Sequence, residues 1–158
     1  MAMEPGGRAD KLGNEYERLW VVRQVLQVLS GEAVAVTWEP AGHDSVGVDV
    51  LVDLPNGLRS LESCKRENGS EGKWTLSHLH SRGVLDAAGK HLNSQPGNRF
   101  AFVSRDPCPE LRDLSERANH HDHATTFYSG LSAALRTAFH QLGAYRNLSP
   151  ADADQDKD

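Results

Sequence analysis

Apolar residues in the first third of the chain change from a helical to a strand-like spacing. Between Asn14 and Ser30 they recur at three- and four-residue steps, which predicts an amphipathic helix; they are Tyr16, Leu19, Trp20, Val22, Val25, Leu26 and Leu29. From Ala33 the period becomes two, which predicts a strand that ends at Glu39. Residues 1–12 carry no such period and are expected to form a flexible leader.

The next segment has the pattern of a β-hairpin. Valines at every second position from 46 to 52 predict a strand that contains Asp49, and a third strand is expected over 58–66. The connecting Pro-Asn-Gly is typical of a tight turn. A three-residue loop ending at Gly57 pairs Asp53 with Arg59 and places Ser63 and Lys65 beside Asp49, whereas a two-residue loop places Glu62 there. Both registers are compatible with the sequence.

The second half of the chain alternates helical and strand-like segments. A helix capped by Thr75 is expected to run to about Leu92, weakened by two glycines, and a buried strand follows over 99–104, parallel to the hairpin. Further helices are predicted over 109–118 and 128–142. The predicted fold is an α/β protein with a mixed sheet, an αβββαβ core of the restriction-endonuclease type and additional C-terminal helices. One domain over 13–148, with one core, and a disordered acidic tail over 149–158 are expected.

Composition narrows the class of protein. With 158 residues, 38% hydrophobic and 25% charged, the chain is typical of a globular protein. It has neither a membrane-spanning run nor a signal peptide, so a cytoplasmic location is expected, with Cys64 and Cys108 as reduced thiols. The net charge of -5 includes -3 from four aspartates and one lysine at the end of the chain. The remaining -2 makes binding of nucleic acid by bulk charge weak.

Asp49 is the first candidate for chemistry. A carboxylate inside a valine-rich strand needs a cation or hydrogen-bond donors to offset its burial. Lys65 can supply an ordinary ion pair. Alternatively, Glu39 at the end of the neighbouring strand can join Asp49 in holding a hard cation such as Mg²⁺. The histidines at 120, 121 and 123 are better explained as a polar loop between helices than as a metal site.

Four short motifs, taken in order, are similar to a known pattern. They are Gly13-x-x-Tyr16-Glu17, Trp38-Glu39, Val48-Asp49-Val50 and Ser63-Cys64-Lys65-Arg66. Together they resemble the PD-(D/E)xK nucleases. More narrowly, and with the segment from Lys73 to Leu85, they resemble the double-stranded DNA endonuclease domain of bacterial anti-phage effectors, such as CBASS-associated nucleases and nuclease-bearing STAND NTPases. The resemblance covers about residues 12–105.

This resemblance implies roles for particular residues. Asp49 and Glu39 would bind Mg²⁺ or Mn²⁺, with the backbone carbonyl of Cys64 completing the coordination. Lys65 would orient the attacking water and offset charge on the phosphate, and Glu17 would reach the same cleft. The family usually carries Glu, Asp or Gln two residues before the lysine, where this chain has Ser63. Glu62 can replace it through a bulge, another acid (Glu67, Glu71 or Asp86) can do so, or the site is weakened.

Three functions follow from these residues. The first is a magnesium-dependent endonuclease that hydrolyses double-stranded DNA, as the effector of an antiviral defence system. The second is a catalytically degenerate module on the same fold, which binds DNA or protein. The third is an interaction domain in which Asp49 is merely paired. Because the near-neutral charge predicts weak DNA affinity for one copy, a homo-oligomer or an association with an NTPase or sensor domain is expected to raise it.

Overall fold

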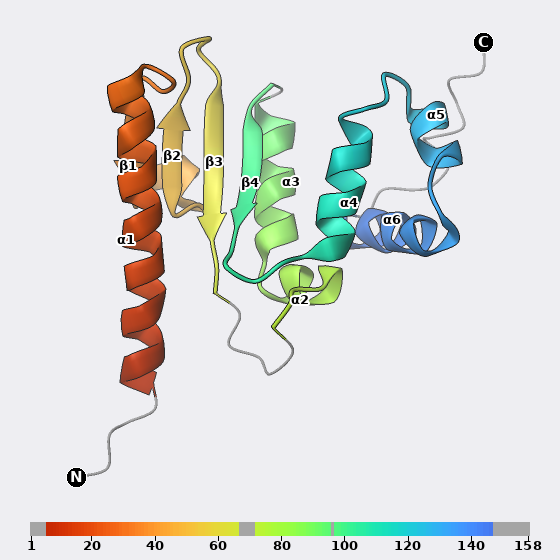
Figure 1. Cartoon of the computed structure of the whole chain (residues 1–158), viewed down its shortest axis with the longest axis horizontal. Coiled ribbons are helices and arrows are strands. Elements are labelled where there is room, and N and C mark those ends of the chain that lie inside the picture. Colours follow the sequence, from red (N-terminus) through yellow and green to blue (C-terminus); the bar gives the residue numbers. More distant parts are fainter. Residues whose placement is uncertain (1–5, 67–71, 96, 147–158) are drawn as a thin grey trace. The chain divides into compact units, whose positions relative to one another are not determined.

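The described part of the chain forms two compact units. The computed structural model describes residues 6–66, 72–95 and 97–146, with side chains from Glu15 onward (Figure 1). Met1–Ser70 and Ala87–Asp106 make up one unit, here called the sheet unit; Glu71–Asp86 and Pro107–Asp158 make up the other, called the helical unit. Each unit has its own apolar clusters, where the sequence predicts a single core.

The sheet unit contains a four-stranded mixed sheet. Its strands are β1 (Ala35–Trp38), β2 (Val50–Asp53), β3 (Arg59–Cys64) and β4 (Arg99–Val103), and they lie side by side in that order. The first three strands are antiparallel, and β4 pairs in parallel with β3. The predicted α/β class and the mixed sheet are thus confirmed, and so is the parallel fourth strand.

The turn between β2 and β3 settles the register that the sequence leaves open. The Leu54 N–H donates to the Leu58 carbonyl over 2.9 Å, and the Gly57 N–H donates to the Leu54 carbonyl over 3.0 Å. Gly57 has a φ of 79°, which favours glycine at this position. The loop therefore has three residues, Asp53 pairs with Arg59, and Ser63 rather than Glu62 falls on the Asp49 face.

The segment before β2 is not a strand, contrary to the sequence prediction. The 3₁₀-helix η1 (Gly42–Ser45) and a turn occupy this region, so Asp49 directly precedes β2. The reason lies at Gly47, where φ is 67° and a Cβ atom would approach the Cβ of Ala87 to 2.5 Å. Close packing against α3 (Val84–Ser94) thus turns the chain here.

Helix α1 (Gly6–Ser30) begins earlier than the apolar pattern predicts and buries only part of that pattern. Tyr16, Trp20 and Val28 pack on the cluster formed by Val50, Val52, Cys64 and Val103. Leu19, Val22, Val25, Leu26 and Leu29, which the sequence assigns to the core face, are exposed. The helix is apolar on two sides, so residue type alone does not identify the buried one. Val48, Leu51 and Leu61 pack with Phe100 in a separate cluster of the same unit.

The helical unit collects the remaining helices. Thr75 caps α2 (Leu76–Ser81) by accepting from the His78 N–H, and Gly83, with a φ of 72°, separates α2 from α3. Helix α4 (Pro109–Ala118) is confirmed as predicted. The predicted last helix is split into α5 (Ala124–Ser129) and α6 (Ala133–Tyr145), because Ser132 caps a new helix after Gly130. Leu76, Leu114, Leu131 and Ala138 form the core of the unit.

Two smaller predictions about the described residues can be checked. The histidines at 120, 121 and 123 lie in the connection between α4 and α5, as expected for a polar loop. None of the helices within the described ranges is long and apolar enough to cross a membrane. The acidic tail over 149–158 and the first five residues of the leader lie outside the described residues.

Candidate active site

Asp49 and Lys65 meet at one edge of the sheet. Because β2 and β3 are antiparallel with Val50 opposite Glu62, Asp49 lies opposite Ser63 and diagonal to Lys65. Lys65 Nζ is 2.8 Å from Asp49 Oδ2, and the same oxygen accepts a hydrogen bond of 2.7 Å from the Cys64 N–H. The side chains of Lys65 and Asp49 are 30% and 26% exposed, so the pair is partly buried yet accessible.

The two carboxylate oxygens of Asp49 have different surroundings. Both hydrogen bonds end on Oδ2, and within the described residues Oδ1 accepts none. A carboxylate oxygen that is accessible and without a donor is the type of ligand a hard cation takes. Asp49 can therefore keep its contacts with β3 and still offer one oxygen to a metal.

Backbone hydrogen bonds fix the two residues in place. The Asp49 N–H donates to the Glu62 carbonyl, and the Asp49 carbonyl accepts from the Glu39 N–H, each over 2.9 Å. The Lys65 N–H donates to the Val103 carbonyl at the end of β4, also over 2.9 Å. Asp49 is thus held between β1 and β3, and Lys65 is held by β4.

Glu17 reaches this edge from α1. Its Oε1 accepts a hydrogen bond of 2.5 Å from the Trp38 indole N–H. Burial raises the pKa of Glu17 above its ordinary value, although the Trp38 hydrogen bond opposes the rise. The negative charges of Asp49 and Glu39 raise this pKa further, and Lys65 lowers it. Asp49, Glu39 and Lys65 are therefore within electrostatic reach of Glu17.

Glu39 directly follows β1 and has an unusual backbone conformation. Its φ is 49°, which makes it the one non-glycine residue in the left-handed region among those that the structure describes. Such a conformation costs about 1–2 kcal/mol for a residue with a Cβ atom. Its N–H bond to Asp49 helps to hold it there, and its side chain is exposed. Strained residues of this kind are concentrated at functional sites.

Glu62 and Ser63 lie on opposite faces of β3. Glu62 is 6% exposed and faces α1, where it accepts from Trp20 Nε1 over 2.6 Å and from Gln24 Nε2 over 3.3 Å. Burial raises its pKa, although these donors oppose the rise. Glu62 therefore lies on the face of the sheet that packs on α1, opposite to the face that carries Asp49. Ser63 is fully buried, and its hydroxyl has no hydrogen-bond partner among the described residues.

The other expected ligands are placed less favourably or lie elsewhere. Cys64 contacts Asp49 through its N–H, whereas the metal-ligand expectation concerns its carbonyl oxygen. Burial, together with nearby Asp49 and Glu17, raises the pKa of the Cys64 thiol to about 12, so the uncoordinated sulfur is protonated near neutral pH. Asp86 belongs to the helical unit. Glu67 and Glu71 lie outside the described residues.

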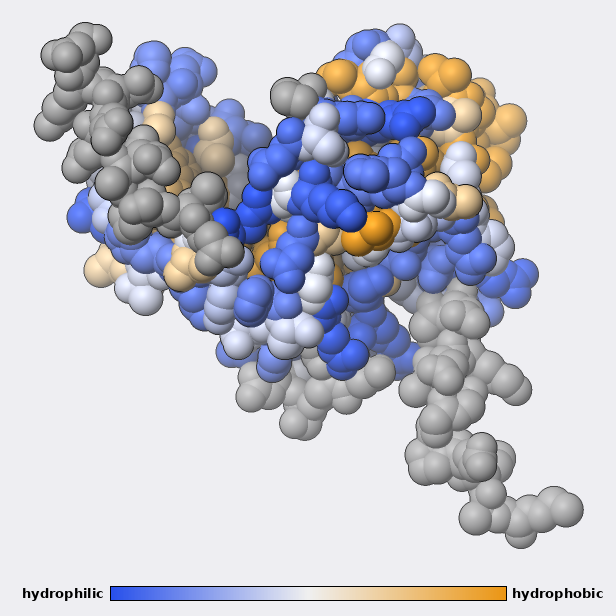
Figure 2. Space-filling view, turned by 180° about the vertical axis from the view of Figure 1, so that it is seen from behind, coloured by the Kyte–Doolittle hydropathy of each residue, from blue (hydrophilic) through white to orange (hydrophobic). Residues whose placement is uncertain are grey.

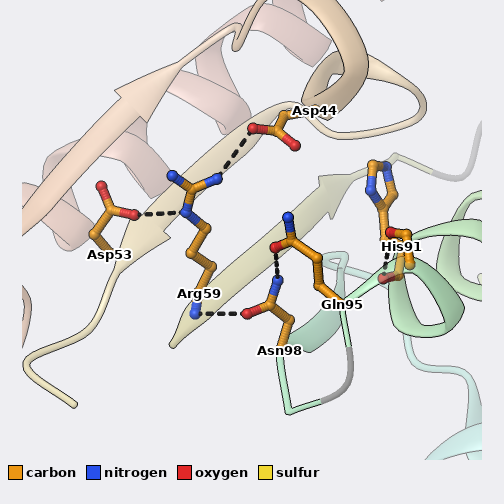
Figure 3. Close-up of polar contacts among 7 residues, drawn as sticks. Asp44, Asp53, Arg59, His91, Gln95 and Asn98 are labelled. Carbon is orange, nitrogen blue, oxygen red and sulfur yellow. Dashed lines mark hydrogen bonds and ion pairs between the residues drawn. The ribbon is translucent and has the colours of Figure 1, made fainter. Parts of the chain in front are cut away.

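A second polar cluster, formed by η1, α3 and the hairpin, is not evident from the sequence. The ligand atoms of His43, Asp44 and His91 lie within 4.8 Å of one another. Figure 3 shows Arg59 between two acids, 3.2 Å from Asp44 and 3.1 Å from Asp53. His91 is buried, and its Nε2 lies 2.9 Å from the Val46 carbonyl. Through these contacts Asp44 links η1 to β3, and His91 links the end of η1 to α3.

Comparison with family models, with curated proteins and with solved structures gives no match for this chain. A functional assignment therefore depends on the arrangement of its own residues. What the arrangement offers is a partly buried Asp49–Lys65 ion pair, with the carboxylates of Glu17 and Glu39 near it, at an accessible edge of a mixed sheet.

Proposed function

We propose that this chain is a metal-dependent endonuclease of the PD-(D/E)xK type, acting on double-stranded DNA as the effector of a prokaryotic anti-phage defence system. The observation that carries the proposal is the meeting of Asp49 and Lys65 over 2.8 Å, with Glu17 and Glu39 in electrostatic reach. The restriction-endonuclease-like core is part of the proposal, supported by helix α1, three antiparallel strands, intervening helices and a parallel β4 in that order.

A divalent cation at this edge is part of the proposal. Asp49 Oδ1 and the exposed carboxylate of Glu39 would hold Mg²⁺ or Mn²⁺, because both ions prefer oxygen ligands. Burial is the main cause of the raised pKa of Glu17, and the charges of Asp49 and Glu39 raise it further, so a bound cation would lower this pKa. Such a cation supplies Lewis-acid stabilisation of phosphate charge.

Lys65 has a separate part in the proposed reaction. Its Nζ lies at the Asp49 carboxylate, and its backbone is fixed to β4. An ammonium group held in this way would orient the attacking water and stabilise the negative charge that develops on the phosphate in the transition state. Trp38 would keep Glu17 pointing to the same edge through its indole N–H.

The test is cleavage of a supercoiled plasmid by the purified chain with Mg²⁺ or Mn²⁺, and with EDTA. Asp49→Asn and Lys65→Met are each expected to lose at least about 100-fold in rate, as for removal of one stabilising group from an active site. Asp53→Asn is the matched control, because it removes the other ion pair of the same hairpin, with partners 39% and 38% exposed. Cleavage by both site variants at the wild-type rate would refute the proposal.

One observation favours a second candidate, the degenerate binding module. Ser63 stands where the family usually has an acid or amide, and its hydroxyl is fully buried. A hydroxyl is a weaker ligand for a hard cation than a carboxylate. Binding of duplex DNA without any cleavage in either metal would support this candidate and exclude the endonuclease.

A further inference from the structure

Helix α1 carries an apolar face that covers nothing in the described structure. Leu19, Val22, Leu26 and Leu29 are 62%, 57%, 59% and 78% exposed. The residues that α1 buries against the sheet lie on its other side and include Tyr16, Trp20, Gln24 and Val28. Figure 2 shows hydrophobic surface gathered on the α1 side of the sheet unit. This exposed face is here called the α1 seam.

The spacing of the α1 seam is that of a helix-pairing surface. Its four residues follow one another at steps of three, four and three, which is the spacing of the a and d positions of a heptad. Val25 and Val34, 44% and 61% exposed, widen the apolar area, and the charged residues Arg18 and Arg23 are exposed at its borders. An apolar centre with a polar rim is the usual anatomy of a protein interface.

We propose that the α1 seam binds the α1 seam of a second copy of this chain about a twofold axis. A surface with this spacing fits a helix of the same spacing, and α1, a helix of 25 residues, is itself such a partner. A twofold interface brings the same patch of both copies together, so one self-complementary helix suffices. The inference stands independently of the proposed nuclease activity.

The size of the face agrees with a dimer. At roughly 100 Å² of exposed surface for each of the six residues, the seam and its two flanking valines present about 600 Å², the upper end for a monomer. Two copies would bury about 1,200 Å², which reaches the range of specific, stable interfaces. In a monomer these apolar side chains would instead stay exposed to water.

The segments of the given sequence outside the described residues have few apolar side chains with which to cover this face. Residues 1–5, 67–71, 96 and 147–158 contain only three large apolar side chains, namely Met1, Met3 and Leu148. The last of these segments is rich in aspartate. A second copy supplies a complete apolar stripe, which these segments lack.

Mass measurement of the whole chain by light scattering after gel filtration tests the proposal. At about 50 µM the wild type is expected at twice 17.3 kDa. Val22→Glu/Leu26→Glu is expected to run as a monomer, while Leu92→Glu, on α3 and 41% exposed, is the control and stays dimeric. Mixing the Glu variant with Val22→Lys/Leu26→Lys is expected to restore the dimer. A monomeric wild type, a dimeric Glu variant or a mixture that stays monomeric would each overturn the proposal.

A second measurement introduces no charge into the seam. Val22→Cys/Leu26→Cys is expected to form a disulfide-linked dimer on mild oxidation, whichever way the two helices run. The native Cys64 and Cys108 are buried and do not compete. Leu92→Cys is the matched control and is expected to stay uncrosslinked. Absence of the link in the double cysteine variant would contradict the proposal even if the charged variants failed to fold.

Discussion

Replacing Glu62 by Gln tests the assignment of this acid to the α1 face. Glu62 is buried on that face and accepts hydrogen bonds from Trp20 and Gln24. Burial raises its pKa above the ordinary value of 4.5, so the folded protein favours the protonated form. Glutamine keeps the shape of that neutral form. It also brings an amide N–H₂ group to Gln24, whose Oε1 lacks a partner among the described residues.

The magnitude follows from the protonation equilibrium. Below pH 4.5 Glu62 is protonated in both the folded and the unfolded chain, so the wild type and Glu62→Gln are expected to agree within about 1 kcal/mol. As the pH rises through the folded pKa, the wild type loses stability, by about 1.4 kcal/mol for each unit of elevation. The variant has no such loss at this position. Its relative stability therefore increases from pH 4 to pH 8.

The assay is urea unfolding of both proteins at pH 4, 6 and 8, followed by tryptophan fluorescence. Glu17 also has a raised pKa, but it is present in both proteins and cancels in the difference. A variant that becomes less stable than the wild type as the pH rises would show that the charged form of Glu62 is stabilised, and would refute the reasoning. Plasmid cleavage by Glu62→Gln is expected to stay near the wild-type rate, because this side chain faces α1.

Three further results are expected. The Cys64 thiol, with a pKa of about 12, should resist iodoacetamide at pH 8 in the folded protein and react only on unfolding. Mass spectrometry detects the labelled product. Rapid labelling under native conditions would contradict the burial of this thiol. Gly47→Ala should lower the free energy of unfolding by about 3 kcal/mol, because the new Cβ meets Ala87 and φ is positive. Gly57→Ala, at a positive φ in open space, should lower it by only about 1 kcal/mol. Equal losses in denaturant unfolding would refute the role of the Ala87 contact. Ser63→Ala should leave thermal stability unchanged or slightly higher, because the buried hydroxyl that it removes has no hydrogen-bond partner in the described part of the chain. A large loss of stability would show that the hydroxyl does make a hydrogen bond.

The hairpin could be predicted well because several local signals agree. The Pro-Asn-Gly turn predicts the hairpin itself, but its register is decided only by the turn hydrogen bonds of Leu54 and Gly57, which bring the opposite charges of Asp53 and Arg59 together. Side-chain alternation then determines which face each residue occupies. The break between α2 and α3 at Gly83 follows from the same kind of local signal, because glycine disfavours a helix interior.

Other features depend on packing that residue type does not encode. The seven apolar residues of α1 predict one buried face, but the sheet takes only part of them and leaves the seam exposed. The start of β2 depends on the approach of Gly47 to Ala87, which lies in α3. The division into two units likewise arises from how separate segments pack, whereas the helix that begins after Ser132 depends on a local cap that the apolar pattern does not reveal.

For the candidate site, the sequence indicates the members but not all of their contacts. Glu17, Glu39, Asp49 and Lys65 are expected at one sheet edge; the structure pairs Asp49 with Lys65 and brings both of them, and Glu39, into electrostatic reach of Glu17. The cluster of His43, Asp44 and His91 could not be predicted, because it forms only when α3 packs beside η1. A His-Asp pair before a strand is too common to signal it alone.

The hydrogen bond from the Lys65 N–H to the Val103 carbonyl also sets the order in which the site can be completed. Glu39, Asp49 and Lys65 are synthesised early. The strand that fixes Lys65 is β4, which is synthesised only after α2 and α3. A nascent or truncated chain ending before β4 holds these three side chains and still lacks their final alignment. The parallel pairing thus delays the assembled edge until this long-range contact forms.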